Sequence, residues 1–295
     1  EMIYGEGGEI TDMIFRQVNS AYERETGIGD AVNRSIYDII PGVEDYWINI
    51  YKTVATTGQS ARLEQHQQDV DMWFDVHFTR VDDEGRFVAI VFNNTTVRKR
   101  VEIARRESAE RQAFLLKLSD TIRPLAAPAD IQGETTHLLR QQLNAAWAYY
   151  VEWDLERQVG LVLRDSARGG LATLAGAHEV SDAPEFLQIL AEGAVLTVSD
   201  YANYELLSAR IRENFVGLGF RSMMMAPLVK EGRLIATLIA GDTEVRDWSA
   251  NESSLLVETA ERTWAAIERG RAEVALRLSE ERFTQFAKAS AAGLW

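Results

Sequence analysis

The 295-residue chain contains no cysteine. Disulfides, thiolate metal sites, a cysteine nucleophile and a cofactor tethered through sulfur are therefore excluded, because each of them needs a thiol. The absence of cysteine also fits a reducing compartment, so we expect a cytoplasmic protein.

Long apolar runs are absent as well. No segment approaches the roughly 18 to 20 apolar residues that a membrane-spanning helix needs, and no signal-peptide pattern opens the chain, so we expect no membrane span. Positive charge is in deficit: the formal net charge of -14 at pH 7 disfavours nonspecific binding to nucleic acid or anionic membranes. Both ends of the sequence read as cut, and we expect a fragment of a longer protein.

What is present is an ordinary globular mixture, with 46% hydrophobic and 26% charged residues. The length allows about two domains of roughly 150 residues each. Apolar side chains of residues 44–56 share one helix face, and residues 72–80 alternate between apolar and polar, as in an antiparallel strand. The predicted fold class is α+β, with two modules that contain antiparallel sheets and are joined by long coiled-coil helices.

A heptad pattern covers residues 97–122. Apolar and small residues recur there at steps of four and three, as in a coiled-coil seam with a polar middle. Pro124 ends this helix. The apolar positions of the seam are Val97, Val101, Leu115, Leu118 and Ile122.

A second α+β block is predicted from residue 129 on. Its helices and strands fall, in chain order, at residues 129–143, 147–153, 159–167, 183–192, 195–198, 206–218, 222–229 and 234–241. Ser249 and Glu252 have the spacing of a capping box at the start of a last helix. That helix carries a second heptad seam, which includes Trp264, Ile267 and Val274. The two seams together predict a homodimer formed through the connector helices.

Residues 1–96 resemble a PAS sensor domain that lacks all or part of its first strand. The resemblance is carried by Val18-Asn19-Ser20-Ala21-Tyr22-Glu23-Arg24-Glu25-Thr26-Gly27, which is similar to the family's N-x-A-x-x-x-x-T-G helix. Where the family ends in Asp-Ile-Thr-Glu-Arg-Lys, this chain reads Asn94-Thr95-Thr96-Val97-Arg98-Lys99. In the family the acid helps to lock the last strand to the exit helix. The resemblance therefore implies a signal junction that is looser or differently wired, at Asn94, Thr95, Thr96 and Arg98.

Residues 123–270 resemble a GAF domain, through Gly219-Phe220-Arg221-Ser222-Met223-Met224-Met225-Ala226-Pro227-Leu228 and Gly232-Arg233-Leu234-Ile235-Ala236. Residues 271–295 resemble a signalling helix and the start of a second PAS domain, with Leu278-Ser279-Glu280-Glu281-Arg282-Phe283. A PAS domain, a helical connector over 97–122 and a GAF domain in this order resemble the input region of bacterial multidomain sensor histidine kinases.

The GAF resemblance implies a ligand pocket between the sheet and the helices at residues 183–192 and 206–218. A mostly apolar pocket with a few convergent polar groups suits a small molecule. The alternative interpretation is that the methionines at 223–225 are adaptable core side chains. The implied ligand-binding positions are Asp200, Tyr201, Tyr204, Ser222, Met224 and Asp242.

We expect no cofactor. Haem-binding PAS domains place a histidine on the helix that corresponds to residues 44–56, where this chain has none, and the flavin-adduct and bilin-attaching types need a cysteine. His137 lacks the adjacent acid of a phospho-accepting histidine, and His178 has no second histidine at ligand spacing. We therefore expect neither a catalytic site nor a metal site in this region.

The expected function is sensory input for a signal-transduction protein, with a sensor histidine kinase of a two-component system as the parent. A small ligand or partner would shift the packing of the connector helices, and an output domain in the same chain would respond. Two alternatives stay open: a ligand-free dimerisation scaffold, and the input region of a cyclic-dinucleotide synthase or hydrolase.

The purified chain is expected to be colourless. It has neither a cysteine for tethering a chromophore nor a histidine on the helix at residues 44–56. Its absorption spectrum should therefore be flat beyond the tryptophan and tyrosine band. A Soret, flavin or bilin band in freshly purified protein would contradict this expectation.

Overall fold

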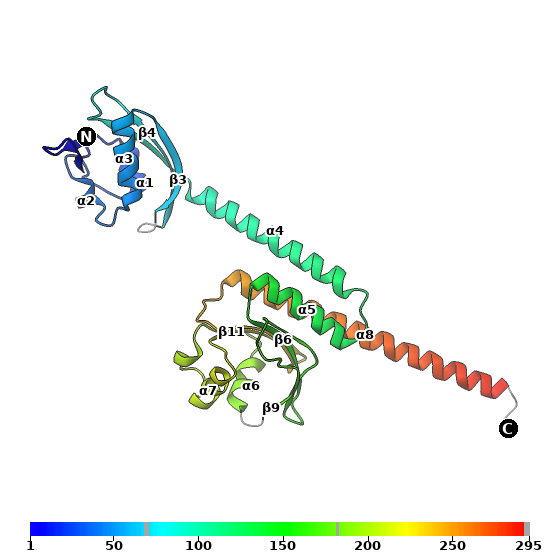
Figure 1. Cartoon of the computed structure of the whole chain (residues 1–295). Helices are drawn as coiled ribbons and strands as arrows, with labels where there is room; N and C mark the ends of the chain where they lie inside the picture. Colours follow the sequence, from blue (N-terminus) through cyan, green and yellow to red (C-terminus); the bar gives the residue numbers. More distant parts are fainter. Residues whose placement is uncertain (68–70, 181–182, 292–295) are drawn as a thin grey trace. The chain divides into compact units, whose positions relative to one another are not determined.

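The computed structural model describes residues 1–67, 71–180 and 183–291. The chain forms two compact units, Glu1–Arg106 and Glu107–Trp295, and the division falls inside the predicted connector. Both units combine helices with antiparallel sheets (Figure 1). The α+β fold class is confirmed at this level.

The first unit contains a two-stranded sheet, β1-β2, and a three-stranded sheet, β3-β4-β5. Three short helices lie between the two sheets in the sequence. The elements in chain order are β1 (Met2–Tyr4), β2 (Ile10–Met13), α1 (Ser20–Thr26), α2 (Ile36–Ile39), α3 (Asp45–Thr57), β3 (Ala61–Gln67), β4 (Met72–Arg80) and β5 (Val88–Asn94). Helix α4 (Thr96–Ile122) follows after a single residue.

Local capping fixes the bounds of these helices. Asn19 Oδ1 accepts a hydrogen bond from the Tyr22 N–H at 3.0 Å, so α1 begins at Ser20. Gly27 and Gly58 follow α1 and α3 with φ of 72° and 71°. This is the left-handed conformation that ends helices and favours glycine.

One face of the three-stranded sheet forms the core of the first unit. Phe74, Val76 and Phe78 of β4 are buried in the same cluster as Trp47 and Val54 of α3. The intervening β4 side chains lie on the opposite face, as the alternation in the sequence predicted.

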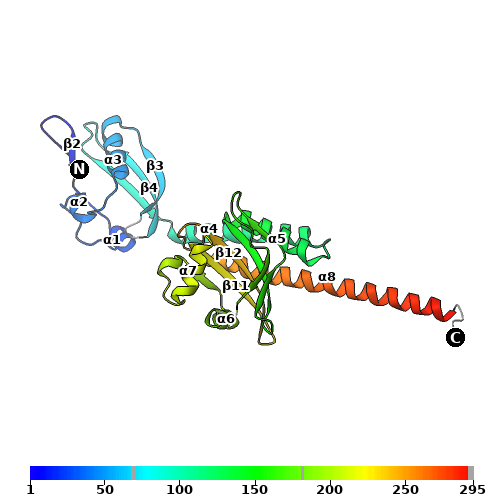
Figure 2. The ribbon, with the colours of Figure 1, turned by 60° about the horizontal axis from the view of Figure 1, so that its bottom comes forward.

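The second unit is built on a seven-stranded antiparallel sheet in the order β10-β11-β12-β6-β7-β9, with β8 paired to β6. Helices α5 and α8 cover one face of this sheet, and α6 and α7 cover the other (Figure 1 and Figure 2). The elements in chain order are α5 (Pro128–Leu143), β6 (Trp147–Asp154), β7 (Val159–Val162), β8 (Asp165–Ala167), β9 (Gly176–Glu179), α6 (Pro184–Ala191), β10 (Leu196–Val198), η2 (Tyr201–Asn203), α7 (Ala209–Gly217), β11 (Ser222–Lys230), β12 (Arg233–Asp242) and α8 (Ala250–Ala291).

Two strand predictions differ from the structure. The predicted strand over residues 159–167 is two strands, because β7 and β8 pair with opposite ends of β6. Strand β9 was not predicted, since all four of its side chains are exposed and no alternation marks it in the sequence.

Side chains of β11 alternate between the two faces of the sheet. Met224 belongs to the core under α5 and α8, whereas Met223 and Met225 belong to the core under α6 and α7. All three are fully buried. Their burial fits the interpretation as adaptable core side chains.

The predicted connector seam is divided by the structure. Val97 and Val101 are 78% and 63% exposed, whereas Leu115, Leu118 and Ile122 are 3%, 0% and 3% exposed. The last three side chains pack into the core under α5 and α8 of their own unit. The end of α4 is therefore a helix of the second unit, and its apolar face is not free to pair with another chain.

Helix α8 begins at the predicted capping box, which is confirmed. The Ser249 N–H donates to Glu252 Oε2 at 2.8 Å, and the Glu252 N–H donates to Ser249 Oγ at 3.2 Å. Ile267 is buried and Trp264 is half-buried against the core under α8, while Val274 is exposed.

The segment expected to open a second PAS domain is part of this helix up to Ala291. The remaining residues, 292–295, lie outside the described part of the chain. Throughout residues 1–67, 71–180 and 183–291, none of the helices combines the length and the apolar character that crossing a membrane requires.

Leu118→Ala is expected to destabilise the second unit by about 2 to 5 kcal/mol, because it leaves a cavity in a packed core. Leu116, on the same helix and 66% exposed, is the matched control. Leu116→Ala should change the free energy of unfolding by no more than about 0.5 kcal/mol. Urea denaturation followed by circular dichroism measures both values, and two equally small effects would show that α4 is not part of this core.

Candidate functional site

The exit from β5 into α4 is fixed by backbone contacts with Trp73 of β4. The Thr95 N–H donates to the Trp73 carbonyl oxygen at 2.8 Å, and the Trp73 N–H donates to Thr96 Oγ1 at 2.9 Å. Asn94 Oδ1 accepts from the Thr96 N–H at 3.0 Å. The neutral amide at Asn94 thus caps the first turn of α4.

The acid that the PAS-like motif lacks at Asn94 is supplied by β3. Glu64 receives the Arg98 guanidinium at 2.5 Å and the Lys99 ammonium at 2.6 Å. The Lys99 ammonium also lies 5.5 Å from the ring centroid of Trp73. The acid at this junction is therefore Glu64 of β3, while position 94 carries a neutral amide.

A second set of contacts joins α4 to Asp71, which directly precedes β4, and through it to His66 of β3. Asp71 Oδ2 accepts from Arg100 at 2.9 Å, and Asp71 Oδ1 lies 2.9 Å from His66 Nε2. The His66 ring packs against Trp73, with centroids 5.1 Å apart. Trp73 is thus the residue around which both sets of contacts are arranged.

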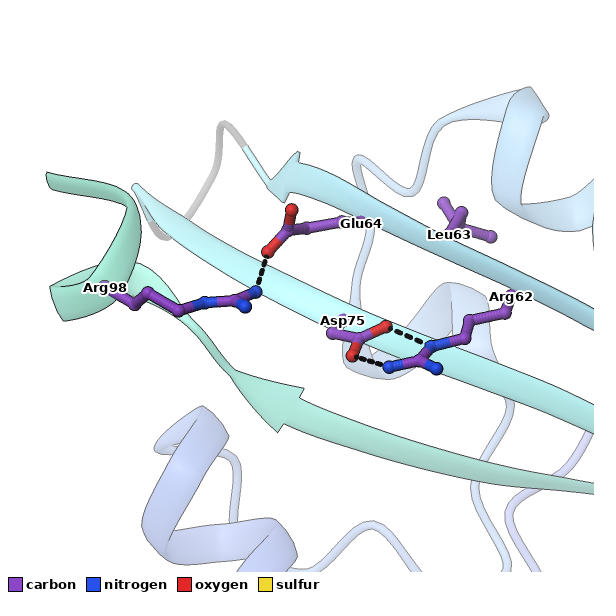
Figure 3. A pocket seen from close by; sticks show the side chains of 5 residues that line it. All are labelled: Arg62, Leu63, Glu64, Asp75 and Arg98. Carbon is purple, nitrogen blue, oxygen red and sulfur yellow. Dashed lines mark hydrogen bonds and ion pairs between the residues drawn. The ribbon is translucent and has the colours of Figure 1, made fainter. Parts of the chain in front are cut away.

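A groove of about 280 Å³ runs along this face of the sheet. Figure 3 shows the two ion pairs within it: Arg62 with both oxygens of Asp75, at 3.0 and 2.7 Å, and Arg98 with Glu64. The side chains of Arg62 and Arg98 are 72% and 66% exposed. Each guanidinium in the groove faces a carboxylate, so the groove is lined by paired charges.

These pairs lower the pKa of two carboxyl groups. The hydrogen bond from Lys99 lowers the pKa of Glu64, and the hydrogen bond from Arg62 lowers that of Asp75. A lowered pKa means that folding favours the charged form. The pairs therefore contribute stability above the unfolded-state pKa of about 4, and this contribution is lost as the pH falls through the lower folded-state values.

In the second unit, the six positions implied for a ligand pocket do not converge. Asp200, Tyr201 and Tyr204 lie in or beside η2, on the α6 and α7 side of the sheet. Met224 belongs to the opposite face, and strand alternation puts Ser222 and Asp242, which pair in the β11–β12 ladder, on that face as well. One pocket on one face cannot use both groups.

The positions on the α6 and α7 side have structural partners. Asp200 accepts hydrogen bonds from the Ala202 N–H at 3.1 Å and from Arg221 at 3.1 Å. Tyr201 is fully buried and stacks on Phe215, with ring centroids 4.8 Å apart. Tyr204 packs, half-buried, against the same core.

Aromatic side chains fill the space between the sheet and α6 and α7. Phe215 contacts Phe186 and Phe220 as well as Tyr201, and Trp147 lies 4.4 Å from Phe220 between ring centroids. A ligand on this side would have to displace some of these rings.

One polar spot lies within this aromatic core. The hydroxyls of Tyr201 and Tyr149 donate to Met223 Sδ, at 3.3 and 3.7 Å. Burial raises the pKa of both tyrosines well above the usual value, so both hydroxyls are neutral donors at physiological pH. A thioether is a weak acceptor, which leaves both donors poorly satisfied.

On the opposite face, Asp242 belongs to an ion cluster. Arg246 contacts Asp242 at 3.2 Å and Glu252 at 2.5 Å, and its guanidinium lies 4.1 Å from the ring centroid of Trp248. Ser222 Oγ is buried and has no hydrogen-bond partner among the described residues. This cluster fixes the start of α8 to the end of β12.

His137 and His178 are exposed. Within the described ranges, no group of three or more histidine, aspartate and glutamate side chains is placed to hold a metal ion. Sequence reasoning missed Glu64 and Asp71, because only the tertiary pairing of β3, β4 and α4 brings them to the junction.

Comparison with known proteins identifies the second unit. Residues 128–267 match the family model for the GAF domain, and a GAF domain at these residues is confirmed. Two similar solved structures are the phycoerythrobilin-bound and the phycocyanobilin-bound GAF domains from a cyanobacterial phytochrome. Each is 20% identical to this chain with a TM-score of 0.50, over 55% of this chain and over 97% and 96% of the respective solved chain. This likeness shows the fold. No curated protein matches the chain.

Glu64→Gln is expected to loosen the start of α4, because it removes the carboxylate that holds Arg98 and Lys99. Amide hydrogen exchange of residues 96–106 at pH 7 should become roughly two- to fivefold faster, the range for an exposed ion pair. Glu102→Gln is the control, since Glu102 is exposed and its contact with Lys99, at 3.6 Å, is much longer than that of Glu64.

The same loosening should occur in the unsubstituted protein on acidification below about pH 4. The exchange rates must be corrected for their intrinsic pH dependence. Equal rates in both variants at pH 7 would show that Glu64 does not hold the junction.

Proposed function

We propose that this chain is the sensory input region of a signal-transduction protein, with a bacterial sensor histidine kinase of a two-component system as its output. The GAF domain supports this proposal, since the two solved domains named above come from a phytochrome. The observation that carries it is the course of the two long helices. Helix α4 begins at the sheet of the first unit and ends in the GAF core, and α8 leaves that core and continues to Ala291.

The first unit is proposed to be a PAS-like sensor module. The support is its order of elements, from the β1-β2 hairpin through three short helices to β3, β4 and β5. The residues from Asn94 to Lys99 then lead from the sheet into α4. In this scheme a signal that moves the sheet acts on α4 through Glu64 and Trp73.

The GAF domain is proposed to take a small ligand on the α6 and α7 side of its sheet. The hydroxyls of Tyr149 and Tyr201 would form better hydrogen bonds with a ligand oxygen than with Met223 Sδ. The surrounding rings suit a mostly apolar molecule. Bilins are ligands of the two solved domains; this chain has no cysteine to tether a ligand through sulfur.

A homodimer is proposed to form through exposed helix surfaces. Val97 and Val101 of α4 are exposed, and Val274 and Leu278 of α8 are 49% and 50% exposed. An isolated helical segment is marginally stable in water, so a second copy that packs along α8 would supply the cover that these side chains lack. A cytoplasmic location is proposed, with which the absence of cysteine is compatible.

The runner-up is a ligand-free dimerisation scaffold, and the filled interior of the GAF domain favours it. Native mass spectrometry of the purified chain distinguishes the ligand-binding sensor from the ligand-free scaffold, because detection of a bound small molecule would exclude the scaffold hypothesis. The input region of a cyclic-dinucleotide synthase or hydrolase would use the same modules. The activity of the output domain, autophosphorylation or cyclic-dinucleotide turnover, decides between these outputs.

Regulation of the parent protein is expected to depend on the rotational phase of α4. Insertion of seven residues after Glu102, in the exposed part of the helix, rotates the following residues by only about 20° from their starting face, while two residues rotate them by about 200°. The seven-residue insertion should retain signal-dependent output, and the two-residue insertion should make the output constitutive or abolish it. If both variants behave alike, α4 is a passive tether.

A further inference from the structure

Helices α4 and α8 lie side by side within the second unit. Three polar contacts join them along their length: Glu107 with Asn251, Arg111 with Glu258 at 3.5 Å, and Ser119 Oγ with Arg262 at 2.7 Å. The sequence separation between hydrogen-bonded partners stays nearly constant, at 143 to 147 residues, along the whole length over which the two helices are in contact. The two helices therefore run in the same direction.

Arg269 of α8 closes the C-terminal end of α4. Its guanidinium donates to the carbonyl oxygens of Ile122 at 3.2 Å, Arg123 at 3.1 Å and Leu125 at 3.3 Å. The last carbonyls of a helix have no partner within it, and a positive charge is favourable at that end. Another helix thus adds to the local hydrogen bonds that cap the C-terminal end of α4.

Gly270 lets the two segments approach closely. A Cβ at this position would lie 2.3 Å from the Ala126 carbonyl oxygen, far inside van der Waals contact with an atom of the backbone. Glycine weakens a helix interior. Its presence within α8 is explained by this close approach, which leaves no room for a side chain. The next residue, Arg271, pairs with Glu152 of β6 at 2.5 Å, which anchors α8 where it leaves the GAF domain.

We propose that Arg269 and Gly270 form a clamp that makes α4 and α8 one mechanical element. A displacement of α4 then reaches α8 at the point where α8 leaves the domain, without passing through the β-sheet. The inference rests on the proposed function, because a relay between helices is what such a clamp serves. Within that relay, Arg269 is a positioning residue that fixes the phase of α8 relative to α4.

Hydrogen exchange of the chain itself tests the clamp, with Arg269→Ala as the first variant. Exchange should become about tenfold faster in residues 114–126, which lose their cap, and also in residues 264–276, which lose their neighbour. Exchange in β11 and β12 should stay unchanged. Arg269→Lys keeps the charge but not the planar fork of donors, so its exchange rates should lie between those of the unsubstituted chain and those of Arg269→Ala.

Gly270→Ala is the second variant, since its methyl group pushes the Ala126 backbone away and leaves the Arg269 side chain in place. It should reproduce the same pattern. Arg277→Ala is the matched control: Arg277 lies on the same helix and pairs with Glu281 of α8 at 3.1 Å. This variant should leave residues 114–126 unchanged.

Three results would overturn the clamp. They are unchanged exchange in Arg269→Ala, faster exchange confined to α4, and faster exchange that includes β11 and β12 to the same degree. The readout does not involve the output domain. The two proposals can therefore fail separately. If hydrogen exchange gives the expected pattern but insertions in α4 do not change the output, the clamp is supported and the proposed function is refuted.

Discussion

The packing of the last turns of α4 against α8 and the sheet is the interaction on which the rest of the molecule depends. It turns a helix that begins at the first unit into a part of the GAF core, through fully buried side chains such as Leu118. It also removes that surface from any contact between copies of the chain. The exposed apolar positions of the two helices include Val97 and Val101 near the start of α4, and Val274 and Leu278 near the end of α8.

The sheet is a single layer that separates the proposed ligand side, under α6 and α7, from the side that α5 and α8 cover. Met223 accepts hydrogen bonds from two buried tyrosines on one face, while Met224 accepts one from the Ser253 hydroxyl of α8, at 3.3 Å, on the other. A ligand that repacks Met223 therefore acts one residue away from a contact of α8. Close packing on both faces means that such a change is not absorbed locally.

Strong periodicity in the sequence was sufficient to predict β4 to the residue, and the capping box identified the start of α8. The six implied ligand positions do not share one face for a physical reason: Ser222 and Met224 alternate with Met223, so they face the other side of the sheet. The heptad seam failed in part for another reason. Spacing shows which residues share a helix face, but it does not show whether the partner is the same chain or a second copy.

The junction shows the same limit of local motifs. Asn94 in place of an acid indicated different wiring, and Glu64 provides the missing charge from a strand thirty residues earlier in the sequence. No spacing rule connects the two positions, because the register of β3 against β4 and the direction of α4 bring them together. The contact of Arg269 with the end of α4 was hidden in the same way, since its partners there are backbone carbonyls and these leave no trace in the sequence.

The most direct test of the account is a distance measurement between α4 and α8 in the whole chain. Because the chain has no cysteine, exposed Ala113 and Ala275 can each be replaced by cysteine and spin-labelled without background. Double electron–electron resonance should give one narrow distance distribution, as expected if α4 and α8 move as one element. A broad or two-component distribution would show that the helices move independently and would contradict the account.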